Sequence, residues 1–236
     1  MTTYSEPERH SYLHPPVDPH HRDGVARILE VLGVRAGDRV IELGAGSGRF
    51  TEVILELGVG VLAIEPDPVL MAGLRDRLDG RPGLAFFEGT IEAAAPEDLR
   101  SARAVVGFHV LHHLDRRSLE GLADRLRAEQ DRPTFLGFAF LEPNPWSPLF
   151  PIQIAFTPGM RFHEERGLWR NDYAAAFAPS GVAVGTLGHQ GLIPPPLARR
   201  LPKSLLPGMP LRTRVPQPFY LYRVIGNVMR KERARP

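Results

Sequence analysis

A glycine-rich segment between a strand pattern and a helix pattern is the part of this sequence best suited to hold a ligand. Gly44, Gly46 and Gly48 follow directly on the apolar stretch at 39–43. Glycines let the backbone turn sharply and let a ligand approach without meeting a side chain. Because a helical pattern begins at once, we expect backbone amides of the turn to face the crevice at the carboxyl end of the strand.

Two acidic residues flank this segment. Glu42 precedes the glycines, and Glu65 ends the next predicted strand at 61–64. A carboxylate at Glu65 can accept hydrogen bonds from both hydroxyls of a ribose, and a solvated strand end is the alternative. A carboxylate at Glu42 would repel a diphosphate and attract an ammonium group. The G-x-G-x-G spacing also departs from the G-x-G-x-x-G fingerprint of nicotinamide dinucleotide sites, so the pattern favours a cationic nucleoside.

The elements that must position these residues follow a regular order. Apolar stretches alternate with amphipathic stretches from about residue 22 to 190, which predicts parallel strands covered by helices and an α/β fold. Strands are expected at 39–43, 61–64, 84–87, 103–108, 134–141, 182–187 and 219–225. Helices are expected at 22–32, after Gly48, from Asp67-Pro68, after Asp115 and across 164–177.

Four stretches, in this order, resemble the motifs of class I S-adenosylmethionine-dependent methyltransferases. They lie at 40–51, 62–67, 87–92 and 106–114. The resemblance covers roughly residues 22–141. It implies a Rossmann-like, seven-stranded, mostly parallel sheet with helices on both faces and an antiparallel last strand. It also implies S-adenosyl-L-methionine as the cofactor.

The resemblance further implies which residues bind this cofactor. These residues would hold the methionine part, the ribose and the adenine, and the last two of them would lie close to the sulfonium. In chain order they are Glu42, Gly44, Ala45, Gly46, Gly48, Glu65, Pro66, Thr90, Ile91, Phe108 and His109. Many family members have an acidic residue at the position of Thr90. A backbone carbonyl or Glu92 is therefore expected to meet the adenine amino group.

Three histidines follow the fourth predicted strand at the mouth of the expected site. An unperturbed imidazole titrates near neutrality, so His109, or else His112, is a candidate general base, with packing at a helix start as the alternative. Glu142, at the end of the fifth strand, could orient an acceptor. His109 and His113 are four residues apart, but no nearby Asp/Glu pair completes a metal site, and no metal is predicted.

The acceptor pocket is expected to have walls from the apolar loop 146–160 and the leader 4–21, because ligand pockets are mostly apolar with a few polar groups. Plain core packing and a disordered leader are the alternatives. The expected substrate-binding residues are Tyr12, His14, Asn144, Trp146 and Phe150.

The 236 residues suffice for one α/β domain. We expect a leader or lid over 1–21 and a single domain over 22–236, with substrate-cap insertions near 143–163 and 193–218. The second insertion could cover the pocket or dock another subunit, and no oligomeric state is predicted.

Composition excludes several classes of protein. The chain has no cysteine, which excludes disulfide staples, zinc ribbons and thiolate catalysis. No apolar stretch approaches the ~20 residues of a membrane span, and the first residues lack a signal-peptide core. The sequence therefore predicts a soluble cytoplasmic protein without a membrane span.

Lysine and arginine residues are concentrated in the segment after residue 199. Such a segment suits an anionic partner such as RNA or lipid, and a solvated tail is the alternative. In nucleobase and glutamine methyltransferases an Asn-Pro-Pro-Tyr signature follows the fourth strand. The superficially similar stretch 142–146 of this chain follows the fifth predicted strand instead, and this argues against a nucleic-acid acceptor.

The sequence is interpreted as a methyltransferase acting on O or N of a small, partly apolar molecule in specialised biosynthesis. An RNA or protein acceptor and a non-catalytic S-adenosylmethionine-binding protein are the alternatives.

Overall fold

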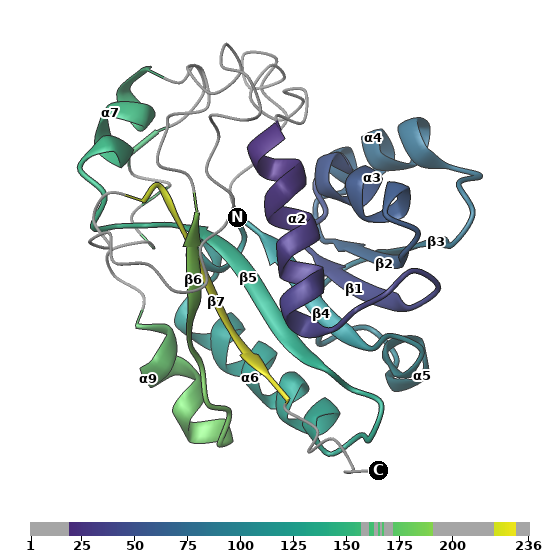
Figure 1. The fold of residues 1–236 in the computed structure, drawn as a ribbon. Helices are drawn as coiled ribbons and strands as arrows, with labels where there is room; N and C mark the ends of the chain where they lie inside the picture. Colours follow the sequence, from purple (N-terminus) through teal and green to yellow (C-terminus); the bar gives the residue numbers. More distant parts are fainter. Residues whose placement is uncertain are drawn as a thin grey trace.

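The computed structural model describes residues 19–156, 161–162, 165, 167, 172–190 and 220–229. The expected leader and the 193–218 insertion lie outside the described residues. Within the described parts of the chain, seven strands form one sheet in the order β3-β2-β1-β4-β5-β7-β6 (Figure 1). None of the helices described there is long and apolar enough to cross a membrane.

The strands lie close to their predicted places. Their bounds are β1 (Arg39–Leu43), β2 (Gly60–Glu65), β3 (Leu84–Glu88), β4 (Ala104–Phe108), β5 (Gly137–Pro143), β6 (Gly185–Gln190) and β7 (Tyr222–Val228). The strands from β3 to β5 in the sheet order pair in parallel, and β7 pairs antiparallel with both β5 and β6. The predicted α/β fold with an antiparallel last strand is confirmed.

Some of the helices begin at an aspartate whose side chain caps them. The bounds of the helices are α2 (Pro19–Leu32), α3 (Arg49–Glu56), α4 (Pro68–Leu78), α5 (Pro96–Arg100), the 3₁₀ helix η2 (Leu111–His113), α6 (Arg116–Gln130), α7 (Leu149–Phe156), α9 (Tyr173–Phe177) and the 3₁₀ helix η3 (Ala178–Ser180). The helices with an aspartate cap are α4, α6 and α9. The Asp67 side chain accepts two backbone N–H bonds at the start of α4, and Asp115 accepts one at the start of α6. These three bonds satisfy amides that a helix start leaves unpaired.

Helices cover both faces of the sheet, with α2, α3 and α4 on one face and α6 and α9 on the other (Figure 1). Successive strand residues point to opposite faces. Val40 accordingly belongs to the core under α2 and α3, and Ile41 to the core under α6. A strand buried on both faces is apolar throughout, as β4 is, and this explains the continuous apolar stretches of the sequence.

The site follows from the strand order. β1 lies between β2 and β4, so the direction in which the chain adds strands reverses beside β1. In open parallel sheets this reversal leaves a crevice at the carboxyl ends of the strands. Glu42, the glycine turn, Glu65 and His109 all lie at that edge.

Three sequence predictions differ from the structure. The stretch 146–160, predicted as an apolar loop, contains the helix α7. The predicted fifth strand began at Thr134, whereas β5 begins at Gly137, which has φ 128° and whose added Cβ would collide with the Asn227 carbonyl. Glycine is therefore required where β7 comes closest to β5. The single helix predicted over 164–177 was also wrong, because Asp172 has non-helical backbone angles and caps a separate helix, α9.

Candidate binding and active site

The three glycines of the turn after β1 have different reasons to be glycine. All have positive φ: 64° at Gly44, 56° at Gly46 and 86° at Gly48. An added Cβ at Gly44 would lie 2.6 Å from the Val110 side chain, and one at Gly48 would collide with Leu74. At Gly46 an added Cβ would meet nothing within 4 Å. Gly46 is therefore the glycine of the three that borders open space, where a ligand can approach the backbone.

Glu65 ties this turn to the end of β2. Its Oε2 accepts a hydrogen bond from the Gly46 amide at 2.8 Å, and its Oε1 accepts one from the Asp67 amide at 3.0 Å. Burial raises the pKa of Glu65, and these two backbone bonds oppose that rise. A carboxylate oxygen has two lone pairs, so each oxygen keeps the capacity to accept one further bond. Two adjacent hydroxyls of a ligand are a suitable donor pair.

Glu42 is buried on the other side of the turn, with 1% of the residue exposed. Thr51 Oγ1 donates a hydrogen bond of 2.6 Å to Glu42 Oε2. Burial raises the pKa of Glu42 to about 8, the Thr51 bond opposes this, and the neighbouring Glu65 carboxylate adds to it. Near neutral pH the carboxyl of the unliganded protein is mostly protonated. A cation bound nearby would favour its ionised form.

The residues expected around the adenine lie at the ends of β2 and β3. The Gly89 amide donates to the Glu65 carbonyl at 3.0 Å, which brings the third motif beside the second. Pro66 and Thr90 are exposed at this edge, and Ile91 is 5% exposed. Glu92, the alternative partner for the adenine amino group, instead lies beside Gly121 of α6.

His109 has an unusual backbone at the end of β4. Its φ is 59°, and among the described residues it is the one non-glycine residue with positive φ. Its amide donates to the Leu141 carbonyl at 2.7 Å, and its ring lies 5.2 Å from the Tyr222 ring and 6.0 Å from the Phe50 ring. Left-handed backbone costs a non-glycine residue about 1–2 kcal/mol, and such strain clusters at functional sites.

A buried charge cluster holds the turn that follows His109. Glu142 accepts hydrogen bonds from the Val110 and Leu111 amides, both at 2.9 Å, and lies 2.6 Å from His112 Nδ1. His112 Nε2 lies 3.1 Å from Glu165 Oε2. Burial alone would lower the pKa of His112, but the Glu142 and Glu165 carboxylates outweigh it and raise the pKa to about 9.

Both ring nitrogens of His112 therefore face carboxylates, and Glu142 is fully buried. In this arrangement His112 and Glu142 fix the turn that follows His109. A direct catalytic role for either stays a prediction.

The residues expected to bind the acceptor are not equally exposed. Asn144 is 1% exposed: its Nδ2 donates to the Tyr220 carbonyl at 2.9 Å and its Oδ1 accepts from the Trp146 amide at 3.2 Å, so it fixes the turn after β5. Trp146 is 71% exposed, whereas Phe150 is buried against Ile154. Tyr12 and His14 lie outside the described residues.

Sequence reasoning missed two residues of this region. Tyr222, on β7, lies beside His109 and could have been found by placing the predicted last strand next to the fifth. Glu165 reaches His112 from a segment that no local pattern links to the fourth motif.

Comparison with known proteins gives matches over part of the chain. Residues 40–128 match the family described as "Methyltransferase domain". The ribosomal RNA small subunit methyltransferase A of Synechococcus sp. (strain CC9605) is 36% identical over 108 residues, which cover 45% of this chain and 38% of that protein. The uncharacterized methyltransferase YrrT of Bacillus subtilis (strain 168) is 32% identical over 91 residues, which cover 39% of this chain and 41% of that protein. The chain thus spans less than half the length of these two relatives.

Solved structures resemble the whole sheet. The methyltransferase domain of bacterial CtHen1 has a TM-score of 0.58 at 15% identity, covering 89% of this chain and 98% of that one. A SAM-dependent methyltransferase from Aquifex aeolicus has a TM-score of 0.54 at 14% identity, covering 90% and 94%. At this level of identity the likeness shows the fold alone.

The raised pKa of Glu42 predicts how stability depends on pH. The pKa is about 8 in the folded protein against an ordinary value of 4.5, so between these values the folded state binds the extra proton. The contribution of Glu42 to the free energy of unfolding is then fully present below pH 4.5 and is lost as pH rises through 8. Glu42→Gln cannot ionise, so its stability relative to the original protein should rise with pH by up to about 5 kcal/mol.

Urea unfolding at acidic, neutral and alkaline pH measures this difference, with Glu88→Gln as the control for loss of an exposed carboxylate. If the difference in the free energy of unfolding between Glu42→Gln and the original protein does not change with pH, the raised pKa of Glu42 is contradicted.

Proposed function

We propose that the chain is a class I S-adenosylmethionine-dependent methyltransferase, because residues 40–128 match the methyltransferase domain family and the sheet resembles that of solved methyltransferases. It transfers a methyl group from S-adenosylmethionine to an oxygen or nitrogen of a small, partly apolar molecule. The observation that carries the proposal is a pair of buried carboxyls, Glu42 and Glu65, on either side of a turn that is open at Gly46.

The residues at this turn fit S-adenosylmethionine, which carries an ammonium group, a positive sulfonium and a ribose. Two buried carboxyls with raised pKa values create a place where positive charge is stabilised and a diphosphate is not. Glu65 has acceptor capacity for the two ribose hydroxyls. Gly46 lets the ligand lie directly against the backbone.

When bound, S-adenosylmethionine supplies an electrophilic methyl group on a positively charged sulfur. The chain's own residues hold and align the two reactants, and alignment accounts for much of the acceleration of a bimolecular displacement. His109 is the candidate base that takes the acceptor's proton. Its strained backbone, its half-buried ring and its place at the end of β4 support this role.

The buried pair of Glu142 and His112 positions this base. Glu142 binds the two amides that follow His109, so the turn has little freedom to move. A base must lie within hydrogen-bond reach of the proton it removes, and a fixed turn maintains that reach.

A small, partly apolar acceptor is favoured by the surface beyond β5. The exposed large apolar side chains in the described part of this region are Trp146 at 71%, Ile152 at 54% and Phe162 at 50%. Ile152 lies on α7, and Trp146 lies in the turn between β5 and this helix, which follows the carboxyl end of β5 (Figure 1). Apolar side chains near the reacting edge suit the apolar part of a ligand.

Ribosomal RNA is the second candidate acceptor. The observation in its favour is the similarity to ribosomal RNA methyltransferase A, which covers 45% of this chain. The family match over residues 40–128 contains the proposed cofactor turn.

Loss of the Glu65 side chain should weaken cofactor binding. Two charge-assisted hydrogen bonds are each worth about 1.5–3 kcal/mol, so Glu65→Ala should raise the dissociation constant of S-adenosylhomocysteine at least about 100-fold. Glu88→Ala is the matched control, because Glu88 is the register partner of Glu65 on β3 and is exposed. Calorimetry measures both, and equal affinities in the two variants would remove Glu65 from the ribose site.

The acceptor and the base can be tested in one assay. The protein is incubated with isotopically labelled methyl donor and a cell extract that has been divided into small-molecule and RNA fractions. We expect label in the small-molecule fraction, and label in RNA alone would replace this acceptor class with the second candidate.

His109→Asn provides the catalytic test, since asparagine tolerates left-handed backbone. The rate of labelling should fall about 100-fold or more while the affinity for S-adenosylhomocysteine changes little. His189→Gln, on the edge strand β6, controls for the loss of a histidine. An unchanged rate in His109→Asn would exclude His109 as the base.

A further inference from the structure

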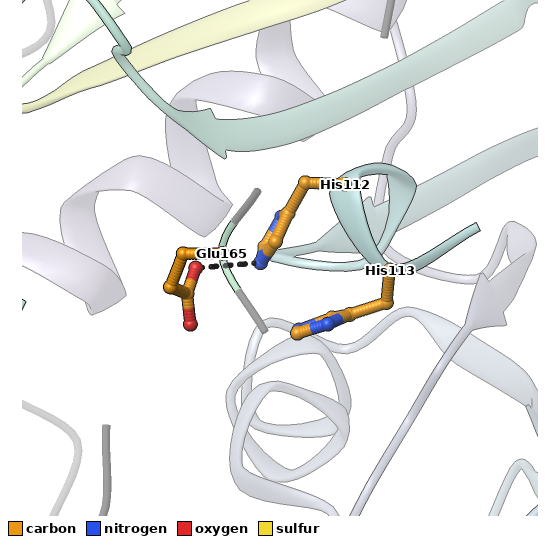
Figure 2. Close-up of side chains that lie close together, drawn as sticks. All are labelled: His112, His113 and Glu165. Carbon is orange, nitrogen blue, oxygen red and sulfur yellow. Dashed lines mark ion pairs between the residues drawn. The ribbon is translucent and has the colours of Figure 1, made fainter. Parts of the chain in front are cut away.

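Three side chains of metal-binding type come together beside the turn that follows β4. His112 and His113 project from η2, and Glu165 approaches them from a segment far along the sequence (Figure 2). One ligand atom from each residue lies within 4.8 Å of the other two. We propose that His112, His113 and Glu165 bind one divalent transition-metal ion.

The distances suit a shared ion. Ligand atoms about 2.1 Å from a tetrahedral metal are separated from one another by about 3.4 Å. His112 Nε2 and Glu165 Oε2 are already 3.1 Å apart. The centroids of the two imidazole rings are 4.0 Å apart, so a rotation of the exposed His113 side chain is the main movement that binding requires.

Glu142 orients His112 as a ligand. The contact of 2.6 Å between His112 Nδ1 and Glu142 Oε2 leaves Nε2 as the nitrogen that faces Glu165. Metal-binding histidines commonly donate their other ring N–H to a carboxylate, which fixes the ring and its tautomer. Glu142 is itself held by the Val110 and Leu111 amides, so this support is rigid.

The Glu165 segment is fitted closely to η2. An added Cβ at Gly167 would collide with the His112 carbonyl, so the backbone two residues after Glu165 lies directly against the histidine turn. Glu165 is buried, with 3% of the residue exposed. Its carboxylate is therefore brought to His112 by backbone packing, not by a chance contact of a long surface side chain.

The donor set selects the kind of metal. Two imidazoles and one carboxylate suit zinc and neighbouring first-row ions, whereas magnesium prefers oxygen ligands alone. Three protein ligands leave a coordination position open to water or to an oxygen of another molecule.

Metal binding can be measured without any methyl donor. The purified protein is treated with chelator, dialysed and titrated with Co²⁺ and with Zn²⁺. Stoichiometry is followed by elemental analysis, and coordination by the visible absorption of bound Co²⁺. We expect a site for one ion per chain that Mg²⁺ does not fill.

Two variants assign the site. His113→Gln changes an exposed residue and should leave the fold intact, and Glu165→Gln removes the carboxylate. Since loss of a supporting residue alone typically weakens metal binding about 10–100-fold, each variant should weaken this site by at least about 10-fold. His189→Gln should bind as the original protein does.

Metal ions bound by histidines outside the proposed site would still be bound in all of the variants. Absence of binding, or equal affinity in the original protein, His113→Gln and Glu165→Gln, would overturn the proposed metal site. Neither outcome would bear on cofactor binding at Glu65, which is measured separately.

Discussion

The burial of two carboxyl groups beside one glycine turn is the constraint from which the account of this protein follows. Glu42 and Glu65 lie at the ends of neighbouring parallel strands, where each is almost completely removed from water. Ionised carboxylates are costly to bury without a partner, and burial raises the pKa of both groups. A cation placed at the turn removes that cost, and this explains why a positively charged nucleoside is the fitting ligand.

The turn after β4 connects this site to the proposed base. A Val110 side-chain carbon lies 2.6 Å from where a Cβ of Gly44 would be, and the Val110 amide donates to Glu142. One residue thus contacts the glycine turn and belongs to the turn fixed by the buried charge cluster. His109 immediately precedes Val110, and its amide bond to the Leu141 carbonyl helps to hold its left-handed backbone. The ligand-binding and reacting parts of the site therefore depend on the same packing.

Local patterns in the sequence were sufficient for the parts of the fold that local physics determines. Asp67 and Asp115 marked helix starts because a capping carboxylate acts on amides two or three residues away. The end of β1 and the glycine turn were equally local. The start of β5 at Gly137 was missed because it depends on the approach of Asn227 from the far end of the chain.

The site shows the same division. The glycines and both acids were identified from the sequence. The three glycines look alike there but differ in role, since nearby side chains leave no room for a Cβ at Gly44 and Gly48, whereas Gly46 borders open space. His112 was predicted as a second candidate base. Its two carboxylate partners are Glu142, on β5, and Glu165, and sequence spacing could not show that these three residues meet.

The most direct test of the central claim is the number of protons released when S-adenosylmethionine binds at neutral pH. It is obtained by calorimetry in two buffers that differ in ionisation enthalpy. With the pKa of Glu42 at about 8, the unliganded carboxyl is mostly protonated, and an arriving cation should expel about one proton. That release should disappear in Glu42→Gln. Binding without proton release, or with the same release in the variant, would contradict the account.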